Sequence, residues 1–330
     1  MDITKTIKIA NFNLSVFGNL LNQSLSVSPQ LMIEFNEGMI KSCSFSSTKS
    51  FIKLWTIPLK SLLLQDAKVA DDASIIDMFP EETVAVVEEE IHNFNFYILK
   101  GDLFRKYISV HNQANVDLEF SLKLIEDKYQ AYSITITGKS ETGSPLKTTF
   151  ILTTEELITN KISDYSAILA ACTPTPDMIE IFLTDKQIQE TKGLIKKLHK
   201  SSVDNSAYLT FTVENNKIKI NDKVFNIEFD VDLELKEKNA ALNNKSLEPN
   251  EQLSFNILKS DFIITGDHTF SFFTSDDSEK VIIVGKYGGS VIWCLTTKIS
   301  EHSNSDMDNS DDTLDALNLS EYGLDDDLPF

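Results

Sequence analysis

The sequence predicts an α+β protein with two similar domains and an acidic C-terminal tail. The first observation is an internal repeat, because residues 96–103 recur as residues 255–262 with five of eight positions identical. Around each copy we expect the same order of elements: strand, helix, meander, repeat, short helix and a second meander. The composition changes at residue 301, after which ten residues are acidic and none is lysine or arginine. The copies lie 159 residues apart, which fits two domains rather than a solenoid.

The first domain is predicted to cover residues 1–153. Its opening strand alternates apolar and polar residues, and Asn11 can cap the amphipathic helix that follows. The expected elements are a strand at 4–10, a helix at 13–21, strands at 30–35, 39–45, 50–57 and 93–99, a short helix at 102–110, and strands at 116–124, 130–137 and 146–152. Clustered acidic residues at 65–90 break this pattern and indicate an insertion or a long loop.

The second domain is predicted at residues 178–300, after an interdomain connector at 154–177. Pro174 and Pro176 prevent a continued helix in the connector and stiffen it. The domain is expected to contain a strand at 178–183, a helix at 185–200, strands at 208–213, 217–220 and 223–235, a polar loop at 236–252, the second repeat copy, and strands at 270–273, 280–285 and 290–297. The tail at 301–330 is predicted to be disordered, because it has little apolar content and much like charge.

The charge of the chain restricts how it can contact nucleic acid. The formal net charge is -20, and the ten acidic residues of the tail leave -10 on residues 1–300. An acidic surface repels phosphate, so a chain of this kind would need a local basic face to handle DNA.

The cysteines and the N-terminus indicate a soluble protein of a reduced, intracellular compartment. Cys43, Cys172 and Cys294 are odd in number and widely spaced, so they form neither a disulfide framework nor a zinc motif. No apolar run approaches the roughly 20 residues of a membrane span, and the N-terminus lacks the apolar segment of a signal peptide.

The motifs of common enzymes are missing from the sequence. It contains no phosphate-binding loop, no zinc protease motif, no nucleophile elbow and no glycine-rich dinucleotide turn. The five histidines lack the spacing of metal ligands. The sequence therefore predicts a protein that is not an enzyme, with no catalytic residue, metal or cofactor.

The helix at 185–200 carries the candidate basic face. At about 100° per residue, its apolar side chains fall within an arc of roughly 120°, and its lysines fill roughly 140° on the other side. Such a face suits sequence-independent contact with phosphates, although a solvated amphipathic helix would show the same pattern. Arg105 and Lys106 on the short helix at 102–110 can add to it. The predicted DNA-binding residues of this helix are Lys186, Lys192, Lys196, Lys197 and Lys200.

The C-terminal tip is the sharpest short motif of the chain. A flexible acidic segment ends in an apolar and aromatic group, which suits docking into a pocket rimmed with arginine or lysine. It resembles the acidic tip by which bacterial single-stranded DNA-binding proteins recruit their partners. The predicted partner-binding residues are Asp325, Asp326, Asp327, Leu328, Pro329 and Phe330.

The order of elements, used twice and joined by a long connector, resembles the DNA sliding clamp fold. Residues 208–220, 253–262 and 281–297 are similar to the C-terminal half of T4-type bacteriophage clamps. The resemblance implies two clamp domains, with antiparallel sheets outside and helices inside, assembled as a homotrimeric ring around double-stranded DNA. The lysine helix would then lie on the inner wall, whereas the helix at 13–21 contains no basic residue.

The resemblance implies a processivity factor of a phage, acting in the cytoplasm of an infected bacterial cell. Its partners would be a DNA polymerase and a clamp loader. The ring itself would catalyse no reaction. The tip is not a usual clamp feature, and a neighbouring clamp or the loader are its possible docking sites. Two alternatives remain open: a single-stranded DNA-binding protein that recruits partners through the tip, and an adaptor that presents the tip without any dependence on DNA.

Overall fold

The computed structural model describes residues 5–47, 50–63, 93–111, 115–126, 128–140, 142–159, 165–198, 207–214, 217–230, 252–266 and 268–299. The chain forms two compact units. The first comprises Met1–Ser44, Trp55–Lys161 and Gly288–Ser290, and the second Phe45–Leu54, Ile162–Tyr287 and Val291–Phe330. The predicted insertion at 65–90, the tail at 301–330 and all but the last residue of the predicted loop at 236–252 lie outside the described residues.

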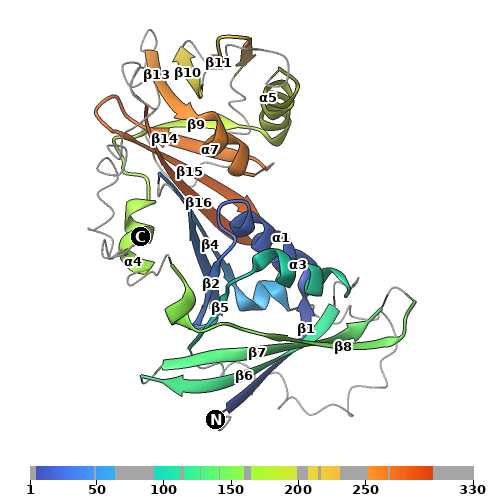
Figure 1. The fold of residues 1–330 in the computed structure, drawn as a ribbon. Helices are drawn as coiled ribbons and strands as arrows, with labels where there is room; N and C mark the ends of the chain where they lie inside the picture. The colour runs from blue at the N-terminus through green and yellow to red at the C-terminus, as the bar shows by residue number, and fades with distance from the viewer. Residues whose placement is uncertain are drawn as a thin grey trace, which may run out of the picture. The chain divides into compact units, whose positions relative to one another are not determined.

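The described residues of the first unit form a mainly antiparallel sheet with the two helices α1 and α3 packed on it (Figure 1). Its sheet runs in the order β1-β6-β7-β5-β2-β3, with β8 beside β7, and β5 with β7 is a parallel pair. The elements are β1 (Lys5–Asn13), α1 (Leu14–Leu25), β2 (Leu31–Asn36), β3 (Met39–Phe45), β4 (Phe51–Pro58), η1 (Leu59–Leu62), β5 (Phe94–Ile98), α3 (Gly101–Ser109), β6 (Asn115–Ile125), β7 (Lys128–Lys139) and β8 (Pro145–Ile151). Strand β4 is divided between the two units. The expected strands and helices of this region are confirmed, with ends that shift by a few residues.

The N-terminal cap of helix α1 lies two residues later in the chain than predicted. The side chain of Asn13, not of Asn11, accepts a hydrogen bond from the amide of Val16 at 3.1 Å. Asn11 lies within β1 at a φ of 54°, beside a register shift in the pairing of β1 with β6. The local backbone irregularity therefore carries the strand two residues further before the helix starts. As expected, the apolar positions of the helix are buried: Leu14, Phe17, Leu20 and Leu21.

Aromatic side chains fill the core of the first unit. The rings of Phe35 and Phe94 stack with centroids 4.6 Å apart, and Phe120 meets both of them edge-on or tilted. Trp55 is fully buried, and its Nε1 donates a hydrogen bond to Ser24 Oγ at 2.8 Å. The one polar atom of this large side chain thus has a partner on α1, which fixes the helix against the sheet.

The predicted connector contains helical structure that the sequence did not indicate. A short 3-10 helix, η2 (Glu155–Leu157), follows β8, and α4 (Tyr165–Ala171) precedes the two prolines. The prolines restrict only the residues beside them, so the stretch before them is free to form a turn of helix. The sequence analysis named no helix in the connector, and the structure adds these two.

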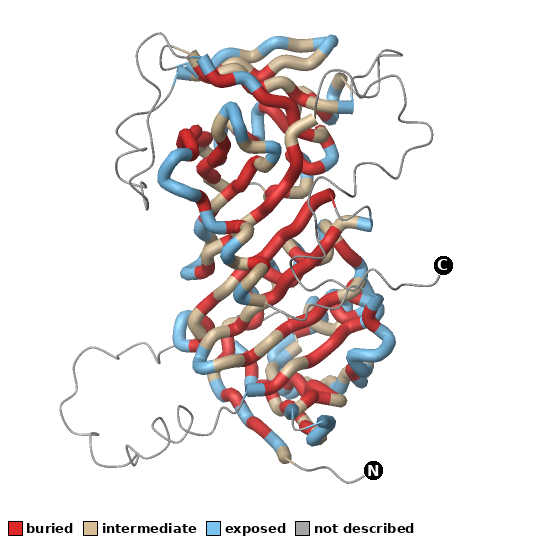
Figure 2. The backbone as a smooth tube through the Cα atoms, turned by 90° about the vertical axis from the view of Figure 1, so that its left-hand side faces the viewer, coloured by how far each residue is buried: buried red, intermediate tan, exposed pale blue. Residues whose placement is uncertain are grey.

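The described residues of the second unit contribute strands to two sheets and form three helices, one of which is α4. In one sheet, β16, β15, β14 and β9 are neighbours in this order, and the other is the four-stranded antiparallel sheet β12-β11-β10-β13. The elements are β9 (Ile179–Leu183), α5 (Asp185–Leu198), β10 (Tyr208–Glu214), β11 (Lys217–Asn221), β12 (Asn226–Asp230), β13 (Gln252–Leu258), α7 (Lys259–Ile264), β14 (Phe270–Thr274), β15 (Lys280–Tyr287) and β16 (Ser290–Thr297). Phe262 on α7 contacts Phe211 of one sheet and Phe272 of the other, so this helix joins the two cores. Buried residues follow the strands of both units (Figure 2).

The internal repeat has the same local structure in both units. Its first copy ends β5 and starts α3, and its second copy ends β13 and starts α7. In each unit the short helix packs against the longer one, α3 against α1 and α7 against α5. The repeat therefore marks the strand-to-helix corner that completes a pair of packed helices.

Candidate nucleic-acid interface

Helix α5 is fixed at its N-terminus by a reciprocal capping arrangement. The amide and hydroxyl of Thr184 donate to Gln187 Oε1 at 2.9 and 3.0 Å, and the amide of Gln187 donates to Thr184 Oγ1 at 3.3 Å. Thr184 and Gln187 are three positions apart in the sequence, which is the spacing of a capping box. Asp185 in the first turn and two lysines in the last turn also match the helix dipole.

The two faces of α5 differ in burial much as the sequence predicts. On one face, Ile188, Thr191 and Ile195 are buried within the second unit. Lys186, Lys196 and Lys197 are exposed. With a rise of 1.5 Å per residue, Lys186 and Lys197 stand about 16 Å apart along one side of the helix, which suits contact with successive phosphates. Lys200 lies outside the described residues.

Lys192 is the exception, and its predicted position on the exposed face is wrong. Its side chain is buried, and Nζ donates to the carbonyl of Ile263 at 2.9 Å and to the carbonyl of Gly266. It also lies 5.8 Å from the centre of the Phe262 ring. These carbonyls are at the C-terminal end of α7, where unpaired acceptors and the helix dipole favour a cation. Lys53 serves the same end, since its Nζ donates to the carbonyl of Ile264 at 2.6 Å.

A helical wheel explains why the sequence misplaced Lys192. The residue lies roughly 40° from Ile188 and 60° from Ile195, at the edge of the apolar arc. A side chain at the edge of the apolar arc can point to solvent or to the core. The Lys192 side chain points inward because the carbonyls at the C-terminal end of α7 accept hydrogen bonds from its ammonium group. The same helix also exposes two acidic side chains, Asp185 and Glu190, which the sequence already shows. Together with its three exposed lysines, they give the exposed face of α5 a net charge of +1.

The first unit contributes fewer charges. Arg105 and Lys106 are exposed on α3 as expected, and Arg105 forms an ion pair with Asp102 at 3.3 Å. Both partners of this pair are exposed, so water competes strongly for it. Helix α1 carries no charged residue at all. Among the five α-helices that the structure describes, the exposed cations therefore come from α3 and α5.

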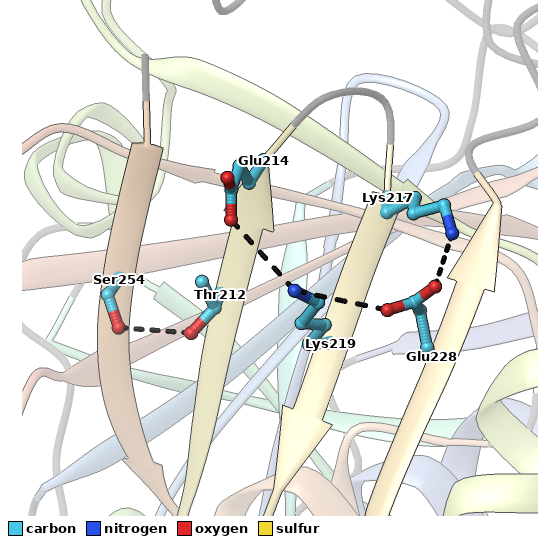
Figure 3. A network of polar contacts seen from close by, with 6 residues as sticks. All are labelled: Thr212, Glu214, Lys217, Lys219, Glu228 and Ser254. Atoms are coloured by element: carbon cyan, nitrogen blue, oxygen red, sulfur yellow. Dashed lines mark hydrogen bonds and ion pairs between the residues drawn. The ribbon is translucent and has the colours of Figure 1, made fainter. Parts of the chain in front are cut away.

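The lysines of the four-stranded sheet, in contrast, are neutralised by neighbouring carboxylates (Figure 3). Lys217 Nζ lies 2.5 Å from Glu228 Oε1, and Lys219 lies 3.9 Å from both Glu228 and Glu214. The hydrogen bond to Lys217 lowers the pKa of Glu228 and raises the pKa of Lys217. A row of polar side chains thus crosses all four strands, from Ser254 through Thr212 to the ion pairs. This face has no surplus of positive charge for phosphates.

Other kinds of site receive no support from the described part of the chain. It contains no group of three side chains placed to hold a metal ion, and none of its helices is long and apolar enough to cross a membrane. The tip residues Asp325, Asp326, Asp327, Leu328, Pro329 and Phe330 lie outside the described residues, so their predicted role is not tested.

The arrangement of two units, each with a packed pair of helices on antiparallel strands, is the two-domain fold of PCNA-like clamps. One chain of the PCNA2-PCNA3 complex from Sulfolobus tokodaii is similar, with a TM-score of 0.53 and 10% identity over 89% of this chain and 99% of that one. Proliferating cellular nuclear antigen from Entamoeba histolytica gives a TM-score of 0.56 and 9% identity over 88% and 98%. No family model and no curated protein matches the sequence. The predicted clamp fold is confirmed, whereas the narrower likeness to T4-type clamps stays a prediction.

Proposed function

We propose that the protein is a DNA sliding clamp, a ring that encircles duplex DNA and has no chemistry of its own. The clamp fold over almost the whole chain is the observation that carries this proposal. Exposed cations on two of the helices that form the packed pairs support it: Arg105, Lys106, Lys186, Lys196 and Lys197.

The charges of the helices suit a ring that moves along DNA. On α3 and on α5 the exposed cations exceed the exposed acids by one. A ring is retained by its topology, so each contact with a phosphate needs only to be weak and exchangeable. Few contacts also mean a shallow salt dependence, since each neutralised phosphate adds about one unit to the slope of affinity against salt.

Two strand edges support assembly into a ring. Among the described strands, β8 pairs with β7 alone and β12 with β11 alone, and neither strand contains a buried residue. Lys147 on β8 and Asp230 on β12 are exposed and opposite in charge. Pairing β8 of one copy with β12 of the next gives a head-to-tail contact, which closes into a ring when the rotation fits. We propose a homotrimer, the assembly that the clamp resemblance implies.

The partners and the biological setting belong to the same proposal. A phage origin is supported by the likeness of residues 208–220, 253–262 and 281–297 to T4-type clamps, and it places the protein in the cytoplasm of an infected bacterial cell. The ring would tether a DNA polymerase and be opened by a clamp loader. The tip, from Asp325 to Phe330, would serve as a docking peptide, because it combines three aspartates with apolar groups.

A threading experiment tests the function without a loader. The protein is incubated with linear duplex DNA that carries biotin at both ends, streptavidin then blocks the ends, and retention is measured after dilution. We expect retention only when the ends are blocked. Equal retention with open ends contradicts a ring, because a surface-bound protein does not depend on the ends.

Charge reversal then tests the helix face. Lys186→Glu, Lys196→Glu and Lys197→Glu together should reduce retention at least tenfold and leave the solution mass unchanged. The matched control reverses three exposed lysines on strands, Lys128, Lys139 and Lys286. Because it changes the net charge by the same amount, an equal loss in the control would assign the effect to overall charge and remove the helix face from the proposal.

The structure offers little for the alternative of single-stranded DNA binding. Proteins of that class stack bases on exposed aromatic rings along a basic groove. The large hydrophobic side chains exposed among the described residues are leucine, isoleucine and valine, and none is aromatic. Most of the described phenylalanines lie in the core instead. Binding to a short single strand that is tighter than binding to duplex would reverse this preference.

A further inference from the structure

Helices α1 and α3 line a groove in the first unit, and Arg105 is the one residue of its lining that the proposed contacts with DNA also involve. Its volume is about 380 Å³, within the range of sites that hold a small molecule or a few side chains. The apolar part of its lining consists of Leu14, Leu21, Leu25, Phe104 and Ile108. Arg105 is the only cation among the polar residues of the lining. His111 also lines the groove, and burial lowers its pKa, which favours the neutral form of its ring.

The cation of the groove is available to a ligand. Arg105 is 56% exposed, and its partner Asp102 is 78% exposed, so an incoming carboxylate can replace Asp102 at little cost. Lys106 is exposed beside it on α3. The groove thus combines an apolar lining with positive charge at one side, which selects a ligand that carries apolar groups next to acidic ones.

The C-terminal segment of this chain has that chemistry. Leu328, Pro329 and Phe330 directly follow three aspartates, and Leu324 precedes them. The proline restricts the backbone, which lowers the entropy lost when the segment binds. Residues 300–323 connect it to Ile299, the last described residue, and 24 residues span up to about 80 Å when extended. A linker of this length does not restrict the segment to the immediate neighbourhood of Ile299.

We propose that the acidic tip, residues 324–330, docks into the groove between α1 and α3. Leu328 and Phe330 occupy the apolar lining, and the aspartates contact Arg105 and Lys106. Tethering gives the tip a high effective concentration at the groove, so a partner that captures the tip must first release it. The inference goes beyond the clamp function and does not depend on it, since it concerns one segment and one groove of the same protein.

A glycine on α1 provides a way to block the groove. Gly18 is part of the lining, and a Cβ atom there would lie 3.6 Å from Ile108 Cγ2, an ordinary contact. Gly18→Leu therefore fits at its first carbon and fills the groove with the rest of its side chain. Gly193 on α5 gives the matched control, because a Cβ there meets nothing within 4 Å and Gly193 does not line the groove.

The experiment measures binding of a fluorescein-labelled peptide of residues 320–330 to full-length protein by anisotropy. The reference protein carries Leu328→Ala and Phe330→Ala, so that its own tip does not compete. We expect the unmodified protein to bind the peptide at least fivefold more weakly than this reference. In the reference background, Gly18→Leu should weaken binding at least tenfold and Arg105→Glu at least fivefold, whereas Gly193→Leu should leave it unchanged.

Three results would overturn the proposal. The first is a reference protein that does not bind the peptide. The second is equal binding by the Gly18→Leu and Gly193→Leu variants with unchanged melting temperatures, which places the tip elsewhere. The third is a Gly18→Leu variant that binds the peptide normally and loses binding of short duplex DNA, which assigns the groove to nucleic acid. None of these measurements tests ring formation, so failure here and failure of the clamp function remain distinct.

Discussion

The two copies of the internal repeat make the same corner from the same residues, yet they differ in burial. In the first copy Lys100 and Asp102 are exposed at the start of α3. In the second copy Lys259 and Asp261 are buried at the start of α7. Lys259 forms an ion pair with Asp222, and Asp261 accepts a hydrogen bond from the hydroxyl of Thr296 at 2.5 Å.

The difference follows from what surrounds each corner. Helix α3 packs on one side against α1 and leaves its polar residues in water, whereas the six-residue α7 joins two sheets through Phe262. A backbone hydrogen bond of 2.9 Å ties each corner to the chain before it, from Gly101 to Pro29 and from Lys259 to Ala207. A repeated sequence thus specifies repeated local geometry, while the contribution of each side chain to stability depends on its neighbours.

The largest expected effect is at the lysine of the corner. Lys259→Ala should destabilise the protein by about 3–5 kcal/mol, because it leaves the carboxylate of Asp222 buried without its partner. Lys100→Ala should change the free energy of unfolding by less than about 0.5 kcal/mol, because Lys100 is exposed. Urea unfolding of the two variants measures both values. Similar losses in the two variants would mean that the corners are energetically equivalent.

The second effect is a pH dependence at the aspartate. Burial raises the pKa of Asp261 from 3.8 to about 6, so its stabilising contribution is complete below about pH 4 and is lost as the pH rises through 6. Asp261→Asn removes the charge and keeps an acceptor for Thr296. The variant should therefore gain stability over the natural protein between pH 4 and 6, by up to about 3 kcal/mol.

Thermal or urea unfolding across pH 4–8 measures this gain. Asp102→Asn is the control, because the exposed Asp102 should give a difference below about 0.5 kcal/mol at every pH. A constant difference between Asp261→Asn and the natural protein over this range would show that Asp261 does not titrate there.

The third and smallest effect is at the middle residue of the corner. A Cβ atom on Gly101 would lie 1.9 Å from Leu25 Cδ2 and 2.9 Å from the carbonyl oxygen of Pro29. The leucine can move, but the backbone oxygen is fixed, so Gly101→Ala should cost about 1–3 kcal/mol. The equivalent Ser260→Ala should cost less than about 1 kcal/mol, since it removes one hydroxyl from an exposed position. A larger loss for Ser260→Ala than for Gly101→Ala would contradict the packing argument.

Much of the fold was accessible from the sequence, because periodicity reports which face of an element is buried. The spacing of Leu14, Phe17, Leu20 and Leu21 predicted the buried face of α1, and all four are buried. The repeat predicted two equivalent strand-to-helix corners, and both are present. The helices in the connector were missed, because two prolines dominated the interpretation of a stretch whose earlier residues they do not constrain.

The candidate site was less accessible, because exposure depends on distant residues. Lys196 and Lys197 are exposed as predicted, but Lys192 binds carbonyls that lie 71 and 74 residues further along the chain. No periodicity in α5 contains that information. The neutralisation of Lys217 and Lys219 likewise depends on the register of β11 with β10 and β12, which the sequence of one strand does not specify.

The proposed ring is tested most directly by the mass of the protein in solution, measured by light scattering on a size-exclusion column over a dilution series. The account predicts a species of about three times the 37.2 kDa chain that persists as the protein is diluted. A mass of one chain at every concentration would contradict a self-assembled ring, and would leave a clamp fold whose β8 and β12 edges do not pair.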